Sequence, residues 1–161
     1  MSPRASRPSS LASPLVSAQA TRLPQVLDAA QAEGAQLVFI DTAPHSESTA
    51  LAAARAADLV LIPCRPAILD LRAIGTTIDL AKLANTPALV VLNAVPARGN
   101  LAHDAAEAIG TYGIAIAPHH LGQRAAFQHA LTLGLTAQEY EPRGKAAEEV
   151  QARATWTQQQ L

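Results

Sequence analysis

Short apolar runs alternate with stretches of helical period along most of this chain. Four runs, at residues 35–40, 58–62, 88–92 and 114–117, are apolar at successive positions rather than at every second one. This pattern is typical of parallel strands that are covered on both faces by helices. A further short strand is predicted at residues 15–17.

Helices are predicted between these runs. Ser46 suits an N-cap and Glu47 suits the positive end of a helix dipole, so one helix is expected to begin there. The longest helix places its apolar residues on one stripe, at Ile68, Leu71, Ile74, Ile78 and Ala81. The predicted helices span residues 22–33, 47–56, 67–84, 101–112, 123–133 and about 144–153. The alternation predicts an α/β fold with a mainly parallel sheet flanked by helices.

The domain organisation follows from where this pattern begins and ends. Residues 1–13 are rich in Ser, Pro and Arg, and we expect them to be disordered. A transit peptide is a weaker interpretation, because the prolines interrupt the amphipathic helix that such peptides need. One domain is expected over residues 14–153, followed by a frayed tail at 154–161.

Composition narrows the classes of function. The formal net charge of −1 provides no overall field that would favour nucleic acid or an acidic membrane. The one cysteine, Cys64, cannot form an internal disulfide, which fits a reducing cytoplasm. No apolar run approaches the roughly 20 residues that span a bilayer, so we expect no membrane partner.

Polar residues follow several predicted strands, where ligands of parallel sheets bind. Asp41 follows the first clear strand, and a carboxylate there suits a magnesium ion, although a residue that only caps a turn is the simpler interpretation. Asn93 follows the third, and its amide suits the edge of a base or a turn before Pro96. The adjacent His119 and His120 have no acid or cysteine nearby in the sequence, so we interpret them as polar loop residues.

Four segments, in this order and spacing, resemble the ParA/MinD family of partition ATPases. They read LVFIDTAPH, AADLVLIPCRPAILDL, ALVVLNAVPARG and QRAAFQHALTLGLTAQEYEPRGKAAEEV, and the likeness covers roughly residues 15–153. The resemblance implies a P-loop NTPase fold of the deviant Walker type that dimerises around ATP and Mg²⁺. It also implies nonspecific DNA binding, a centromere-binding ParB-like partner and a cytoplasmic, nucleoid-associated protein.

The resemblance also implies roles for individual residues. Asp41 matches the Walker B aspartate that is linked to magnesium, and Thr42 begins the switch segment that ends at Ser46. Asn93 and Pro118 match positions beside the adenine. Arg124 lies where DNA-contacting basic residues of the family tend to fall, although an exposed helical arginine is more often a solvated charge.

The chain departs from the family at the phosphate-binding element. It contains no glycine-rich KGGxGKT loop, and its lysines, Lys82 and Lys145, lie outside any such loop. Loop amides and a lysine supply most of the affinity for a triphosphate, so ATP and Mg²⁺ binding is expected to be lost. We interpret the chain as an N-terminally truncated ParA-like protein that does not bind or hydrolyse ATP alone, so the sequence assigns no catalytic residue.

Two other functions fit the sequence. The chain is also consistent with a non-enzymatic regulator, or interaction module, that pairs with an intact ParA-like subunit or with a second copy of itself. A phosphoacceptor domain that uses Asp41 is less favoured. Such a domain needs a lysine at a later strand end, where this chain has Pro63, Asn93 and Pro118.

Overall fold

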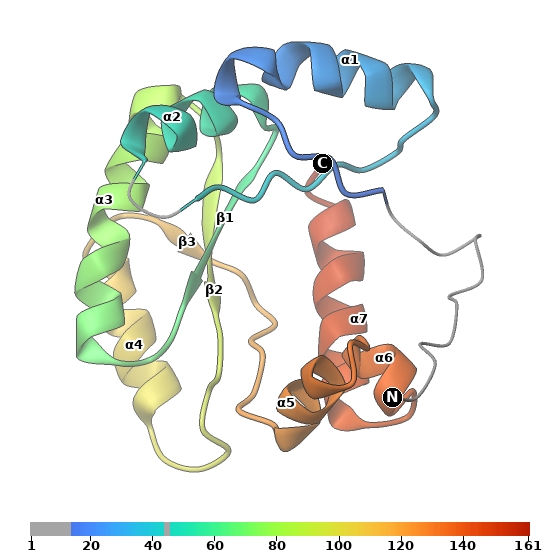
Figure 1. Cartoon of the computed structure of the whole chain (residues 1–161). Helices are drawn as coiled ribbons and strands as arrows, with labels where there is room; N and C mark the ends of the chain where they lie inside the picture. The colour runs from blue at the N-terminus through green and yellow to red at the C-terminus, as the bar shows by residue number, and fades with distance from the viewer. Residues whose placement is uncertain (1–13, 44–45) are drawn as a thin grey trace. The chain divides into compact units, whose positions relative to one another are not determined.

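The computed structural model describes residues 14–43 and 46–161, which fall into two units divided between Phe39 and Ile40. In the first unit a 3₁₀ turn, η1 (Ala20–Arg22), leads into helix α1 (Leu23–Ala32) (Figure 1). A proline in the first turn of α1 suits a helix start, where its missing N–H is not needed. The helix predicted over residues 22–33 is therefore confirmed, whereas the predicted disorder of residues 1–13 lies outside the described residues.

The second unit is an α/β domain with a small parallel sheet. The strands lie in the order β1-β2-β3, and β1 pairs with β2 from Val60 opposite Ala88 to Cys64 opposite Leu92. Its elements are α2 (Glu47–Ala56), β1 (Val60–Cys64), α3 (Ile68–Ala84), β2 (Ala88–Leu92), α4 (Leu101–Gly110), β3 (Ala115–Ile116), α5 (Ala125–Thr132), α6 (Ala137–Tyr140) and α7 (Lys145–Gln158). The predicted α/β class with a parallel, helix-flanked sheet is confirmed.

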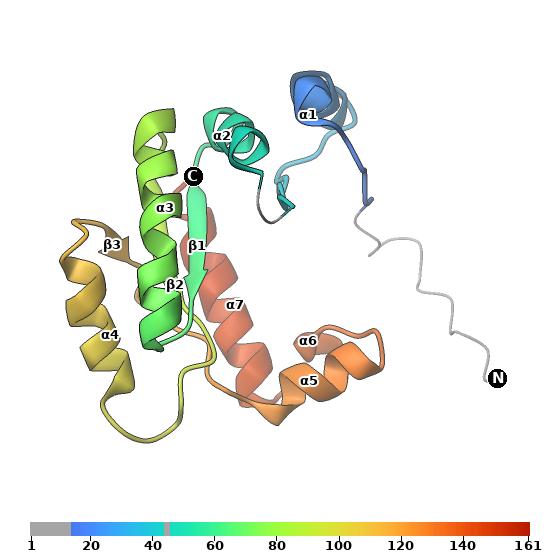
Figure 2. The same cartoon turned by 60° about the vertical axis from the view of Figure 1, so that its left-hand side comes forward.

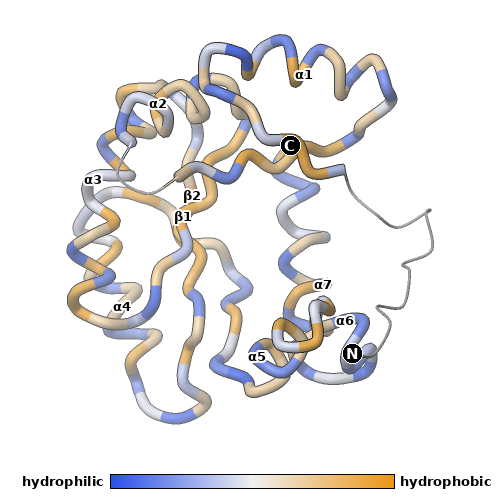
Figure 3. The backbone as a smooth tube through the Cα atoms, in the orientation of Figure 1, coloured by the Kyte–Doolittle hydropathy of each residue, from blue (hydrophilic) through white to orange (hydrophobic). Residues whose placement is uncertain are grey.

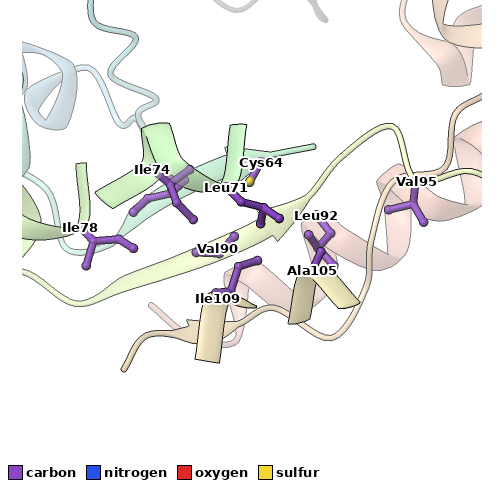
Figure 4. Close-up of a cluster of buried hydrophobic side chains, with 10 residues drawn as sticks. Cys64, Leu71, Ile74, Ile78, Val90, Leu92, Val95, Ala105 and Ile109 are labelled. Atoms are coloured by element: carbon purple, nitrogen blue, oxygen red, sulfur yellow. The ribbon is translucent and has the colours of Figure 1, made fainter. Parts of the chain in front are cut away.

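The core lies between the sheet and two of its helices. Helices α3 and α4 lie on one side of the sheet, and α7 lies on the other (Figures 1 and 2). Buried side chains of β1, β2, α3 and α4 form one cluster, in which Val90 and Ile109 have no exposed surface (Figure 4). Burial of this kind is the main favourable term in folding, so the cluster fixes how the sheet and both helices pack.

The strand predicted over residues 35–40 is wrong, and so is the short strand at 15–17. Both segments are irregular, and neither pairs with a strand in residues 14–43 or 46–161. The apolar side chains of Leu37, Val38 and Phe39 are exposed, and that of Phe39 is exposed over 78% of its surface. A run of strand-forming residues becomes a strand only where another strand supplies hydrogen bonds, and no described strand does so here.

Strand β1 extends through Pro63, where the sequence predicted an end. The Val60 N–H donates to Pro87 O and the Asn93 N–H donates to Cys64 O, both over 2.8 Å. In a parallel ladder alternate residues bond to the same neighbour, so the backbone groups of Leu61 and Pro63 point away from β2. The side of β1 away from β2 is an edge of the described sheet. Pro63 lacks only an N–H that would face this edge, so it is compatible with the strand.

Several other elements differ by a few residues from their predicted boundaries. Strand β3 covers only Ala115–Ile116, and α6, which was not predicted, begins at a capping box between Thr136 and Glu139. Ser46 precedes α2 as expected, but its hydroxyl donates to Thr49 Oγ1 instead of capping the backbone. Helix α7 continues to Gln158, so residues 154–158 are helical where a frayed tail was expected.

Hydropathy along the backbone matches this arrangement. Strands β1 and β2 are mainly hydrophobic, whereas the connection between β2 and α4 is more polar (Figure 3). Among the described residues, no helix combines the length and the apolar character that crossing a membrane requires.

Candidate ligand-binding site at the carboxyl ends of the strands

A cavity of about 620 Å³ lies where β1 and β2 end. Its lining comes from the segments that follow these strands, from the segment that leads into α5, and from helices α4 and α5 themselves. The lining residues are Arg65, Pro66, Ala67, Asn93, Ala94, Pro96, Leu101, Leu121, Gly122, Gln123, Arg124, Phe127 and Gln128. In open parallel sheets this edge is where ligands bind, and the volume suits a small molecule.

The turn after β2 shapes one wall of the cavity. The side-chain Oδ1 of Asn93 accepts a hydrogen bond of 2.8 Å from the Ala94 N–H, and Ala94 adopts a left-handed φ of 51°. Val95 then bonds to the segment before α5, since its N–H donates to Leu121 O and its carbonyl accepts from the Gln123 N–H. These bonds hold residues 93–95 beside residues 121–123, so Asn93 and Arg124 line the same cavity.

Arg124 is held in place by Glu149 of α7. Its Nε and Nη2 donate to Glu149 Oε1 over 2.9 and 2.5 Å, and the Gly122 N–H donates to Oε2 over 3.0 Å. The hydrogen bond to Glu149 raises the pKa of Arg124. Burial acts to raise the pKa of Glu149, but its hydrogen bonds and nearby positive charges lower that pKa overall. The pair therefore stays ionised at neutral pH and fixes the α5 N-terminus against α7.

Arg65 is the second arginine at the cavity, and it follows β1 directly. Its side chain is exposed, and none of the described residues forms an ion pair with its guanidinium. The sequence did not point to Arg65, because the strand was predicted to end at Ile62, with Pro63 as the residue at its end. It also missed Glu149, whose contact with Arg124 spans 25 residues of sequence and leaves no local signal.

The structure brings together some of the residues that the sequence singled out. Asn93 and Arg124 line the cavity, whereas Asp41, Thr42 and Pro118 are not among its lining residues. The side chain of Asp41 is exposed. Pro44 and His45, inside the predicted switch segment, lie outside the described residues.

Metal-binding groups do not gather in the described part of the chain. Residues 14–43 and 46–161 contain no group of three or more His, Cys, Asp or Glu side chains placed to hold a metal ion. Asp41 therefore belongs to no such group among these residues.

Comparison with known protein-family models gives no match for this sequence. Comparison with curated proteins gives no match either.

Proposed function

We propose that this protein is a ParA-like partition protein that has no ATP turnover of its own. The observation that carries the proposal is the placement of Asn93. Asn93 directly follows β2 at the end of the ALVVLN segment, and β2 pairs in parallel with β1 of the DLVLIP segment. Asn93 also lines the cavity. The four sequence segments and the position of Asn93 together favour this family over other parallel α/β proteins.

The lack of turnover is proposed from the chemistry that phosphates require. The sequence has no KGGxGKT loop, and neither Lys82 nor Lys145 lines the cavity. Asp41 alone would repel a triphosphate unless Mg²⁺ bridged the two. The remaining contact, to the base through Asn93, would contribute only about 1 kcal/mol, and Pro118 does not line the cavity. The ATP and Mg²⁺ of the family are therefore proposed to be lost here.

Calorimetric titration with Mg-ATP, and thermal unfolding with and without it, test this proposal. We expect no dissociation constant in the low-micromolar range and no rise of several degrees in the midpoint, beside an intact ParA-type ATPase as a positive control. A low-micromolar dissociation constant, or a midpoint raised by several degrees, would show that a nucleotide site exists. Electrophoretic shifts of nonspecific DNA test the partition role separately, and no shift with or without an intact subunit would count against it.

A second candidate function, a regulator that pairs with an intact ParA-like subunit, is favoured by the outer edge of β1, which pairs with no strand among the described residues. The N–H and C=O of Leu61 and the C=O of Pro63 point away from β2, and β1 is the first strand in the sheet order. An edge strand with unpaired backbone groups is a template for pairing with a strand of another chain.

Co-purification with an intact ParA-type subunit tests this second candidate. The variant Leu61→Pro removes the outward N–H and leaves the bonds to β2, whereas Leu61→Ala keeps that N–H and serves as its matched control. We expect the proline variant to lose the partner and the alanine variant to retain it, with cooperative unfolding checked for both. Equal retention by both variants would mean that the β1 edge is not the interface.

A further inference from the structure

The charged residues that line the cavity are all positive. The lining includes two arginines, Arg65 and Arg124, and its residues include no acid. Glu149 neutralises much of the charge of Arg124 through their hydrogen bonds. Arg65 has no such partner among the described residues, so its charge is available to a ligand.

Three helices begin at this cavity. Ala67 precedes the first residue of α3, Leu101 is the first residue of α4, and Arg124 precedes the first residue of α5, and all three line the cavity. No side chain caps any of these helix starts. The unpaired N–H groups and the helix dipoles add positive potential beside Arg65.

Nearby ionisable groups offset this potential only in part. Asp70 and Asp104 lie in the first turns of α3 and α4, but neither lines the cavity. His120 lies close enough to Glu149 to be among the groups that lower the pKa of that carboxyl. The free guanidinium of Arg65 thus remains the strongest uncompensated charge.

The rest of the lining is largely apolar. Pro66, Pro96, Leu101, Leu121 and Phe127 contribute, and the volume of about 620 Å³ suits a ligand larger than a bare ion. We propose that the cavity binds a small molecule in which a phosphate or carboxylate group is attached to an apolar body. The anionic group lies against Arg65 and the uncapped helix starts, and the body contacts Leu121 and Phe127. This chemistry differs from the neutral base edge that the family resemblance implies beside Asn93.

Calorimetric titration of the full chain at low salt tests this proposal with four probes. Phenyl phosphate and benzoate carry the two kinds of anion on the same ring, phenol carries the ring alone, and adenosine offers a neutral base. We expect one or both anionic probes to bind, and phenol and adenosine to bind at least about tenfold more weakly, because a charge-assisted hydrogen bond contributes most of the affinity. The tighter of the two anionic probes identifies the group. Equal binding of phenol, or preferential binding of adenosine, would overturn the proposal.

Two arginine variants locate the site. Arg65→Gln is expected to weaken binding of the tighter anionic probe by about tenfold or more. The matched control Arg72→Gln removes an exposed arginine of α3 that does not line the cavity, and it is expected to leave binding unchanged. Equal weakening by both variants would point to nonspecific charge, and no effect of Arg65→Gln would place the anion elsewhere. Thermal unfolding of each variant confirms that the fold is retained.

Discussion

The Arg124 guanidinium donates from Nε to Oε1 of Glu149 over 2.9 Å, and this bond joins the start of α5 to α7. The other carboxylate oxygen of Glu149 accepts from the Gly122 N–H. The Glu149 side chain therefore holds both Gly122 and Arg124, the ends of the segment 122–124 that leads into α5. Both side chains are mostly buried, with 31% and 19% of their surfaces exposed. In such surroundings a hydrogen-bonded ion pair contributes more than one in open solvent does.

Replacing Glu149 is predicted to destabilise the fold. The variant Glu149→Gln removes the negative charge and leaves the Arg124 guanidinium without its counterion. We expect a loss of about 1–3 kcal/mol in the free energy of unfolding at neutral pH, measured by urea denaturation. The neighbouring, exposed Glu148→Gln is the control and should change stability by less than about 0.5 kcal/mol. Equal losses in the two variants would contradict a specific role for the pair.

The same pair predicts a dependence on pH. The pKa of Glu149 in the folded chain is below its ordinary value, so the folded state favours the ionised form. Its contribution is therefore complete above the unfolded pKa of about 4.3 and is lost as the pH falls through the folded pKa. The difference in unfolding free energy between wild type and Glu149→Gln should be constant from about pH 6 to about pH 8. It should shrink below about pH 4. A difference that shrinks instead at alkaline pH would show that another group is responsible.

Arg153 is predicted to destabilise the chain. It is 8% exposed, and its three guanidinium nitrogens have no hydrogen-bond partner among the described residues. Its contact with the Trp156 ring, 5.6 Å away, contributes about 0.5–2 kcal/mol, whereas an unpaired buried ion costs several. We expect Arg153→Met to raise the free energy of unfolding by about 1 kcal/mol or more, and the exposed Arg72→Met to leave it unchanged. Destabilisation by Arg153→Met would reveal a partner for the guanidinium.

Local patterns in the sequence predicted the parts of the fold that depend on local signals. The run at residues 88–92 is β2, and the helix expected at 47–56 is α2. The stripe of Leu71, Ile74 and Ile78 is buried, although Ile68 in the same stripe is 63% exposed. Helical period and apolar runs are encoded within a few residues, which explains why these elements were predictable.

Pairing between strands was less predictable, because it depends on distant residues. The run at residues 35–40 has strand composition, and only the absence of a described partner strand distinguishes it from β1. A proline at position 63 predicts the end of a strand, unless the strand is known to lie at an edge of the sheet. In the same way, Asn93 was found from its place after a strand, whereas Arg65 and Glu149 became recognisable as cavity residues only once the fold placed them.

Cys64 is predicted to resist alkylation in the folded protein. Its side chain is 3% exposed. Burial, and to a lesser extent the nearby Asp70 carboxylate, raise the pKa of its thiol. Little thiolate is therefore present at neutral pH, and an alkylating reagent can reach the thiol only when the chain opens. Iodoacetamide should modify the native protein much more slowly than the urea-unfolded protein, as followed by mass spectrometry. Similar rates in the two states would mean that β1 is not stably packed.

The final prediction concerns Ile109, which joins α4 to the sheet. It has no exposed surface and belongs to the same buried cluster as Val90 of β2. The variant Ile109→Ala removes buried methyl and methylene groups and leaves a cavity, so we expect a loss of about 2–5 kcal/mol in the free energy of unfolding. Ile109→Val should cost only about 0.5–1.5 kcal/mol, because one methylene is lost.

Leu131→Ala is the matched control for this prediction. Leu131 lies on α5 with 76% of its surface exposed, so its truncation should change stability by no more than about 0.5 kcal/mol. Urea denaturation monitored by circular dichroism measures all three variants under the same conditions. The graded order, with Ala at position 109 well below Val, is what a tightly packed core requires. Equal effects at positions 109 and 131 would mean that α4 is not packed against the sheet, and that the cavity bordered by the first residue of α4 lacks a fixed wall.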